Sequence, residues 1–306
     1  MAELNGDRDN EGILMPYNYL MKFKGKGSRL KIIRAFDHWL QVPKDNLHSI
    51  LEAANMMYIG TLLIDDIQDD SQVRRGLPAA HRVYGVPFTI NAGLHILLLA
   101  LDNIFKLKPQ AATVASSQML EITRGQGMDI YWREKEVCPT EDQYKHMAEQ
   151  KTGRLLSLFV QIMQLFSEKR NDYTDLALLM GYYFQIRDDY CNLFNQEALE
   201  EWPDIDNQQA FRSDIFCEDI TEGKFGFPII HALQSSEGAE ILDILRERTR
   251  NVNVKKHCLS LIEKAGSLQY TRGVMADLDR KARAEVARFG GNPAMIAVLD
   301  ELLDWQ

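Results

Sequence analysis

The stretch Leu62–Asp70, which reads LLIDDIQDD, determines how the rest of the sequence is interpreted. It joins an apolar helical run to four aspartates. Asp65 and Asp69 are four residues apart, so on a helix they share one face and lie about one turn from each other. Two such carboxylates repel, and the C-terminal end of a helix disfavours anions as well. The sequence therefore predicts a cation at this helix end.

A second acidic cluster repeats the arrangement. The stretch Phe184–Asn192 reads FQIRDDYCN at the end of another apolar run, and Asp188 stands four residues before Asn192. The alternative is that each cluster is only a solvated helix end. Two clusters that each end an apolar helix instead suggest opposite rims of one cavity. Hard oxygen ligands favour Mg²⁺, which commonly bridges carboxylates to substrate phosphates.

Basic residues could complete an anion site between these clusters. Carboxylates, magnesium and a ring of cations above an apolar pocket together indicate a diphosphate clamp. The candidate cations are Lys26, Arg29, Arg74, Arg75, Lys151 and Lys224.

The composition is that of an ordinary globular protein. Its 306 residues include 35 Lys and Arg against 44 Asp and Glu, a net charge of −9. This balance argues against a nucleic-acid partner, because duplex affinity comes mainly from Lys and Arg. It does not exclude an anionic substrate that arrives with divalent cations, because part of the acidic surplus lies in the two clusters.

Cysteine spacing and apolar run lengths indicate the compartment. The four cysteines lack zinc or disulfide spacing, and Met1–Glu11 has no apolar signal core. The longest apolar run, Leu94–Leu101, is too short to span a bilayer. We therefore expect a soluble cytoplasmic protein without a membrane span.

Apolar residues recur at three- and four-residue spacing with no sustained alternation, which predicts an all-α fold. We expect one domain over 1–306, a helical bundle around a central apolar cavity, with a polar tail at 1–12 and a surface loop at 197–214. Thr140 and Gln143 form a predicted capping box. The predicted helices cover 30–41, 46–70, 87–107, 111–135, 140–168, 173–198, 228–235, 238–248, 253–265 and 268–289.

From about Ile13 to Asn292 the chain resembles the trans-isoprenyl diphosphate synthases, closest to the animal and fungal geranylgeranyl diphosphate synthases. The resemblance rests on DDIQD with SQVRRG and PAAH, then RGQGMDIYWRE, CPTEDQY, QKTG, FQIRDDYCN, FCEDITEGKF and GGNP. It implies the helical isoprenoid synthase fold and Mg²⁺ between the motifs, three ions per site, with Mn²⁺ as a substitute. The implied metal ligands are Asp65, Asp66, Asp69 and Asp188.

The same resemblance implies roles for the other candidates. Catalysis would involve Asp65, Asp69, Lys151, Gln185, Asp188 and Lys224. The allylic diphosphate would be gripped by Arg74, Lys151, Thr152, Gln185 and Lys224. A second substrate, isopentenyl diphosphate, would bind at Gly25, Lys26, Arg29, Arg75 and a histidine on the helix before the first motif.

That histidine is absent, and Tyr58 stands in its place, two helical turns before Asp65. Tyrosine is uncharged at neutral pH and bulkier, so it cannot replace a diphosphate-binding imidazole. A tolerated change beside an intact cationic site is the alternative interpretation. The chain also departs from the family pattern at Gly27, Thr123, Arg154 and Asp214.

Two further patterns concern the pocket and the assembly. Gly60 and Thr61 are small residues just before the first motif and suggest a deep pocket, which Phe159 could narrow. The helix over 87–107 is more apolar than one exposed face requires. Core packing would account for this. The more specific interpretation is a homodimer interface, and members of the family that the chain resembles form dimers.

Three functions remain open at this point. The leading hypothesis is a Mg²⁺-dependent class I terpene synthase that ionises geranyl or farnesyl diphosphate and releases diphosphate with a terpene hydrocarbon or alcohol. Terpene synthases of this descent are known in insects. The alternative is a geranylgeranyl diphosphate synthase, and the third is an inactive regulatory subunit of a heteromeric synthase. Paired carboxylates argue against the third, because a pure partner has no physical need for them.

Overall fold

The computed structural model of the protein describes residues 12–23, 25, 27–194 and 216–305. Most of these residues are helical, which confirms the predicted all-α class. The elements are α2 (Met15–Met21), α3 (Ser28–Leu40), α4 (Lys44–Gln68), β1 (Val73–Arg74), β2 (Leu77–Pro78), α5 (Ala80–Tyr84), α6 (Val86–Leu107), α7 (Ala111–Lys135), α8 (Glu141–Ala148), η1 (Glu149–Gly153), α9 (Arg154–Gln164), α10 (Thr174–Phe194), α13 (Glu218–Glu222), α14 (Phe227–Ala232), α15 (Gly238–Glu247), α16 (Val252–Lys264), α17 (Ser267–Arg288) and α18 (Pro293–Leu302).

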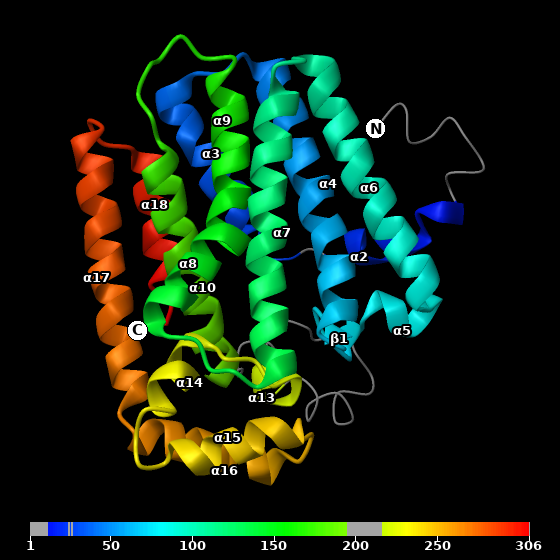
Figure 1. Ribbon diagram of the computed structural model, residues 1–306. Helices are drawn as coiled ribbons and strands as arrows, with labels where there is room; N and C mark the ends of the chain where they lie inside the picture. The colour runs from blue at the N-terminus through cyan, green and yellow to red at the C-terminus, as the bar shows by residue number, and fades with distance from the viewer. Residues whose placement is uncertain (1–11, 24, 26, 195–215, 306) are drawn as a thin grey trace.

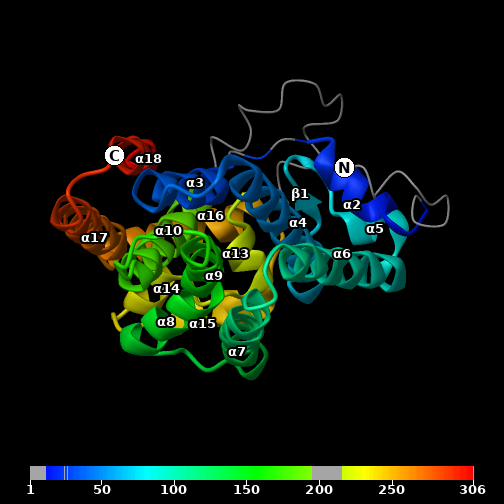
Figure 2. The same cartoon turned by 90° about the horizontal axis from the view of Figure 1, so that it is seen from above.

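The long helices form a bundle that the shorter ones close at one end. In Figure 1, α3, α4, α7, α9 and α10 run side by side, and α13 to α16 lie across their lower ends. The view from above in Figure 2 shows α6 beside α4 at one edge of the bundle and α17 beside α10 at the opposite edge. Apolar side chains from Leu14 to Leu302 make one continuous buried cluster. The predicted N-terminal tail, apart from Gly12, and the loop at 197–214 lie outside the described residues.

The predicted helix over 140–168 is interrupted. It begins with the predicted capping box: Thr140 Oγ1 accepts from Gln143 N at 3.2 Å, and Gln143 Oε1 accepts from Thr140 N at 2.8 Å. After α8 the chain widens into one π-helical turn, η1, before α9 begins. Such π-turns are frequent at functional sites, and this one carries Lys151 and Thr152.

The structure also contains a small hairpin and short helices that the apolar pattern does not predict. Strands β1 and β2 pair antiparallel around a two-residue turn at Arg75 and Gly76, which have φ values of 55° and 74°. Two positive φ values are what a tight hairpin turn of this kind requires. Helices α2, α5, α13 and α18 have no counterpart among the predicted helices, although the comparably short α14 and α15 do.

Helices α4 and α6 pack closely along each other. A Cβ atom on Gly60 would lie 2.7 Å from Ile96 Cγ2 and 3.1 Å from the carbonyl oxygen of Gly93. The expectation that Gly60 lines the pocket is therefore wrong, because its small size serves the approach of α6. By length and composition both helices are apolar enough to cross a membrane. In the bundle, α4 and α6 pack against each other, and the end of α4 carries the first aspartate motif.

Candidate active site

A cavity of about 1560 Å³ opens between α4, α7 and α10 and brings most of the predicted site together. Apolar side chains such as Leu97, Met119 and Leu155 line one part of it. Both aspartate motifs contribute to another part. The predicted site residues that line it are Arg29, Tyr58, Thr61, Asp65, Arg74, Arg75, Lys151, Thr152, Gln185, Asp188 and Lys224.

Phe159 and Asp69 are predicted site residues that do not line the cavity. Phe159 is fully buried and does not line the cavity, which ends on α9 one turn earlier at Leu155. The expectation that Phe159 narrows the pocket is therefore wrong. Lys26 lies outside the described residues.

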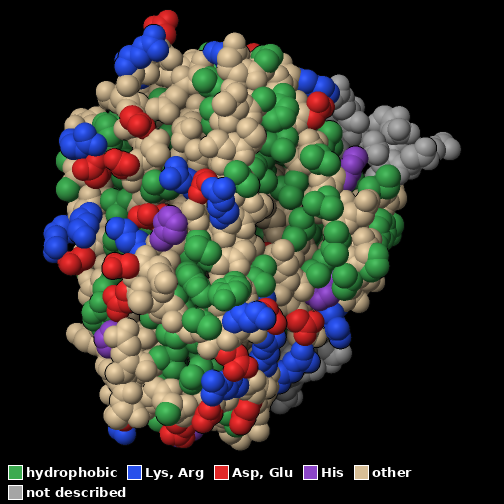
Figure 3. Space-filling model, in the orientation of Figure 1, with side chains coloured by type: hydrophobic (Ala, Val, Ile, Leu, Met, Phe, Trp, Pro, Cys, Tyr) green, Lys and Arg blue, Asp and Glu red, His purple; other side chains and the backbone are tan. Residues whose placement is uncertain are grey.

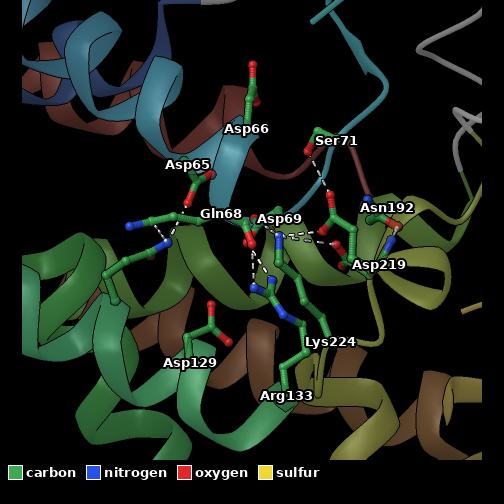
Figure 4. Close-up of polar contacts among 12 residues, drawn as sticks. Asp65, Asp66, Gln68, Asp69, Ser71, Asp129, Arg133, Asn192, Asp219 and Lys224 are labelled. Atoms are coloured by element: carbon green, nitrogen blue, oxygen red, sulfur yellow. Dashed lines mark hydrogen bonds and ion pairs between the residues drawn. The ribbon is translucent and has the colours of Figure 1, made fainter. Parts of the chain in front are cut away.

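Asp65 points toward α7 and η1 (Figure 4). Its Oδ1 accepts a hydrogen bond from Gln126 Nε2 at 2.8 Å, and Lys151 Nζ lies 3.8 Å away. Lys151 is also paired with Asp129 at 2.7 Å. Burial alone would lower the pKa of Lys151, but Asp129 and Asp65 outweigh it and raise that pKa, so the ammonium stays charged.

Asp69 is buried between two cations. Its Oδ1 lies 2.5 Å from Arg133 Nη1, and its Oδ2 lies 2.6 Å from Lys224 Nζ. Burial would raise the pKa of Asp69, but the charges of Lys224, Lys151 and Arg133 together hold it below its usual range. Lys224 also pairs with Glu222 at 2.6 Å. A metal ion at Asp69 would therefore have to replace Lys224 as its partner.

Asp66 has a different partner from Asp65 and Asp69. Its carboxylate is 1% exposed, does not line the cavity, and points away from Asp65 and Asp69 in Figure 4. Arg74 binds it through Nη2 at 2.5 Å and Nε at 2.7 Å. Burial raises the pKa of Asp66 to about 6 despite this arginine. Asp66 therefore anchors Arg74 at the cavity edge, and its role as a metal ligand stays a prediction from the sequence.

The two aspartates of the second motif have different surroundings. Both line the cavity, but Asp188 is exposed and Asp189 is buried. Asp189 Oδ2 accepts from the Tyr144 hydroxyl at 2.5 Å and from Phe227 N at 2.9 Å, and Oδ1 accepts from Gln185 Nε2 at 2.9 Å. Asp188 is thus the more exposed carboxylate of the pair, and Asp189 is the one held by these hydrogen bonds.

Sequence reasoning missed three residues on one face of α7. Gln126, Asp129 and Arg133 are spaced by three and four residues, and they contact Asp65, Lys151 and Asp69 respectively. They lie within the quoted stretch RGQGMDIYWRE. Their helical spacing was a usable signal, because it places all three on the same side of one helix.

The side of the cavity expected to bind a second diphosphate is built differently. The Arg29 guanidinium carbon lies 4.7 Å from the ring centre of Tyr58 and 4.7 Å from that of Phe184. Arg75 Nη1 donates to the carbonyl oxygens of Leu20, at 3.2 Å, and Phe23. Both cations are therefore engaged by the chain itself.

The donor chemistry of the cavity fits Mg²⁺. Asp65 and Asp188 present carboxylate oxygens from α4 and α10 to the same cavity, and such hard oxygens are the ligands that Mg²⁺ prefers. As placed within the described ranges, no three His, Cys, Asp or Glu side chains converge on one metal position. Lysines 151 and 224 instead lie against the first motif.

An all-helical bundle whose apolar cavity carries paired carboxylates and lysines defines a class of enzyme that handles the diphosphate ester of an apolar chain. The chain belongs to the polyprenyl synthetase family, which residues 10–262 match. It is therefore an enzyme of the prenyltransferase type and works in prenyl diphosphate chemistry, in a family that in general depends on Mg²⁺.

Named relatives cover nearly the whole chain. A terpene synthase of Matsumurasca onukii is 49% identical over 304 residues, 98% of this chain and 96% of that protein. A geranylgeranyl pyrophosphate synthase of Mucor circinelloides f. lusitanicus is 42% identical over 94% of this chain and 92% of its own length. The geranylgeranyl pyrophosphate synthase of Dictyostelium discoideum is 38% identical, with 97% and 94% covered.

Proposed function

We propose that this protein is a cytoplasmic, single-domain, Mg²⁺-dependent class I terpene synthase that ionises geranyl or farnesyl diphosphate. One observation carries the proposal. Asp65, Lys151 and Lys224 remain around an apolar cavity, whereas Tyr58 and Arg29 contact each other on the side that would bind isopentenyl diphosphate. The residues expected to ionise an allylic diphosphate are thus retained. The histidine expected to bind isopentenyl diphosphate for condensation is absent.

Each residue then has a physical task. Lys151, Lys224 and Arg74 line the cavity and provide positive charge for the diphosphate. Asp65, Asp69 and Asp188 would hold Mg²⁺, which would supply further charge to stabilise the leaving diphosphate. Apolar residues such as Leu97 and Met119 exclude water from the hydrocarbon chain.

The relatives support the two leading hypotheses unequally. Identity to the terpene synthase is 49%, and identity to the Mucor geranylgeranyl pyrophosphate synthase is 42%. The second candidate function, condensation with isopentenyl diphosphate, is favoured by one observation, the retention of Arg29 and Arg75 at the cavity. An inactive regulatory subunit finds no support in a cavity that still gathers the ionisation residues.

One assay separates these functions. Purified protein is incubated with Mg²⁺ and geranyl or farnesyl diphosphate, with and without isopentenyl diphosphate. We expect a volatile terpene and free diphosphate in both cases. If the only products are chain-elongated diphosphates, seen as longer alcohols after phosphatase treatment, the terpene synthase proposal fails. No turnover of any kind would favour the regulatory subunit.

We also propose that the enzyme is a homodimer through the outer face of α6. Leu94 and Leu98 on this helix are 50% and 65% exposed, and Leu120 on α7 is 53% exposed. Figure 3 shows apolar side chains over the part of the surface where Figure 1 places these helices. A second copy would cover this apolar surface.

A further inference from the structure

Tyr144 is fully buried, although its hydroxyl is polar, and it contributes to the wall of the cavity. The hydroxyl donates to Asp189 Oδ2 at 2.5 Å. Asp189 has no arginine or lysine within bonding distance among the described residues, and it is held by three neutral donors: Tyr144, Phe227 N and Gln185. A buried carboxylate without a cationic partner is costly in free energy, so it depends on its hydrogen bonds to these donors.

The network has a fixed direction. A carboxylate can only accept, so Asp189 must attract the amide nitrogen of Gln185, and it does so at 2.9 Å. The amide oxygen of Gln185 then faces Thr152, whose hydroxyl donates to it at 2.7 Å. The order of donors and acceptors from Tyr144 to Thr152 therefore follows from the charge on Asp189.

This direction decides what the cavity wall offers to a ligand. With the Thr152 proton directed to Gln185, the Thr152 oxygen and the Gln185 carbonyl oxygen keep lone pairs for the cavity, which both residues line. Oxygen lone pairs stabilise a positively charged carbon, whereas an amide N–H or a hydroxyl proton directed at it would oppose the charge.

We propose that Tyr144 is a positioning residue: through Asp189 it fixes the orientation of Gln185, and thereby turns acceptor oxygens toward the reacting hydrocarbon. The inference deepens the proposed function, since it assumes that a carbocation forms in this cavity. Four elements contribute, namely α8, η1, α10 and the start of α14. Tyr144 itself does not touch the reacting atoms in this scheme.

The first test is Tyr144→Phe, which keeps the ring and removes one donor to Asp189. We expect kcat for disappearance of the allylic diphosphate to fall about tenfold while KM changes less than twofold, because the cations assigned to the diphosphate, Lys151, Lys224 and Arg74, are untouched. Tyr182→Phe is the matched control: it lies on α10 with its ring centre 6.5 Å from that of Tyr144, but outside the cavity wall. Equal effects of the two substitutions would overturn the proposal.

The second test asks whether Tyr144 acts through the network rather than by packing. Thr152→Val removes the far end of the chain of hydrogen bonds and keeps the side-chain shape. In a double-mutant cycle on kcat, we expect Tyr144→Phe and Thr152→Val to be strongly non-additive. Additive losses, or a loss of thermal stability with kcat per folded molecule unchanged, would show a structural role only.

This test is separable from the terpene synthase proposal. The cycle follows loss of the allylic diphosphate and needs no knowledge of the product. If the products are elongated diphosphates but the cycle is non-additive, the proposed function fails and the role of Tyr144 stands. If terpenes form but the cycle is additive, only the role of Tyr144 fails.

Discussion

At the scale of single residues, the aspartates of the two motifs differ in the groups that they contact. Asp65, Asp188 and Asp189 line the cavity, Asp66 holds Arg74, and Asp189 also holds Gln185. Neighbouring aspartates thus differ in role because successive positions on a helix face different directions.

Asp65→Ala is expected to abolish turnover. The substitution removes an implied metal ligand and one of the two carboxylates beside Lys151. We expect kcat to fall at least about a thousandfold with the fold retained, as judged by circular dichroism. A fully active variant would contradict the metal assignment.

Tyr58→His is expected to improve the binding of isopentenyl diphosphate. The Arg29 guanidinium now lies over two aromatic rings, a contact of about 0.5–2 kcal/mol per ring. Replacing one ring with an imidazole weakens that contact and adds a donor for the diphosphate. Calorimetry with the allylic site filled by an unreactive thiodiphosphate analogue measures the effect, and Tyr58→Phe, which keeps the ring, should bind no better than the parent protein.

At the scale of elements, η1 positions Lys151 and Thr152 by packing tightly against α7 and α10. A Cβ atom on Gly181 of α10 would lie 2.3 Å from Gly153 Cα, closer than any neighbour can tolerate without moving. The π-turn and the helix that faces it therefore depend on each other for their geometry.

Gly181→Ala is expected to destabilise the protein and to impair catalysis. Overpacking against backbone costs about 1–3 kcal/mol, and relief requires η1 to shift with Lys151. Urea denaturation and kcat measure the two effects. Gly127→Ala on α7 is the control: nothing lies within 4 Å of its added Cβ, so stability should rise slightly. Similar behaviour of both variants would contradict the packing argument.

At the scale of the whole molecule, the acidic residues at the cavity make stability depend on pH. Burial, with repulsion from Glu222, raises the pKa of Glu218 from 4.5 to about 8. Between these values the folded protein binds a proton that the unfolded chain does not. Stability of the metal-free protein should therefore fall as pH rises from about 5 to about 8, by at most about 1.4 kcal/mol per pH unit for this one group.

Urea midpoints measured in EDTA from pH 5 to pH 8 check this expectation. Glu218→Gln should flatten the dependence, because the amide cannot ionise. Mg²⁺ should stabilise the parent protein more at pH 8 than at pH 6, since metal binding favours deprotonated carboxylates. A midpoint that rises with pH in EDTA would contradict the sign.

Leu98→Glu tests the assembly. Leu98 is the most exposed large apolar side chain of α6, at 65%. At a two-fold interface the introduced carboxylate would lie against the same carboxylate of the second copy or against apolar side chains, and either contact disfavours the dimer. We therefore expect the variant to sediment as a monomer at micromolar concentration. Glu141, at the start of α8, offers the control substitution Glu141→Gln away from that face. A monomeric parent protein would exclude the dimer.

Much of the fold and part of the site could be read from the chain alone. The long helices follow from apolar spacing, and the Thr140 capping box follows from two residues three positions apart. The hairpin at Arg75 has strands of only two residues each, too few for a periodic pattern, and helices α2, α5, α13 and α18 were missed. Gly60 illustrates a different limit: a small residue near a motif serves a pocket or a helix crossing equally well, and only the position of α6 distinguishes them.

The sequence by itself determined the all-helical class, the two aspartate motifs and the cationic residues, because these depend on local spacing and side-chain chemistry. Only the tertiary structure decided which carboxylate meets which partner. Asp66 and Arg74 are eight residues apart, but Asp69 meets Arg133 and Asp189 meets Tyr144 across 64 and 45 residues. Such pairings arise when packed helices bury charges together, and burial is a property of the whole fold.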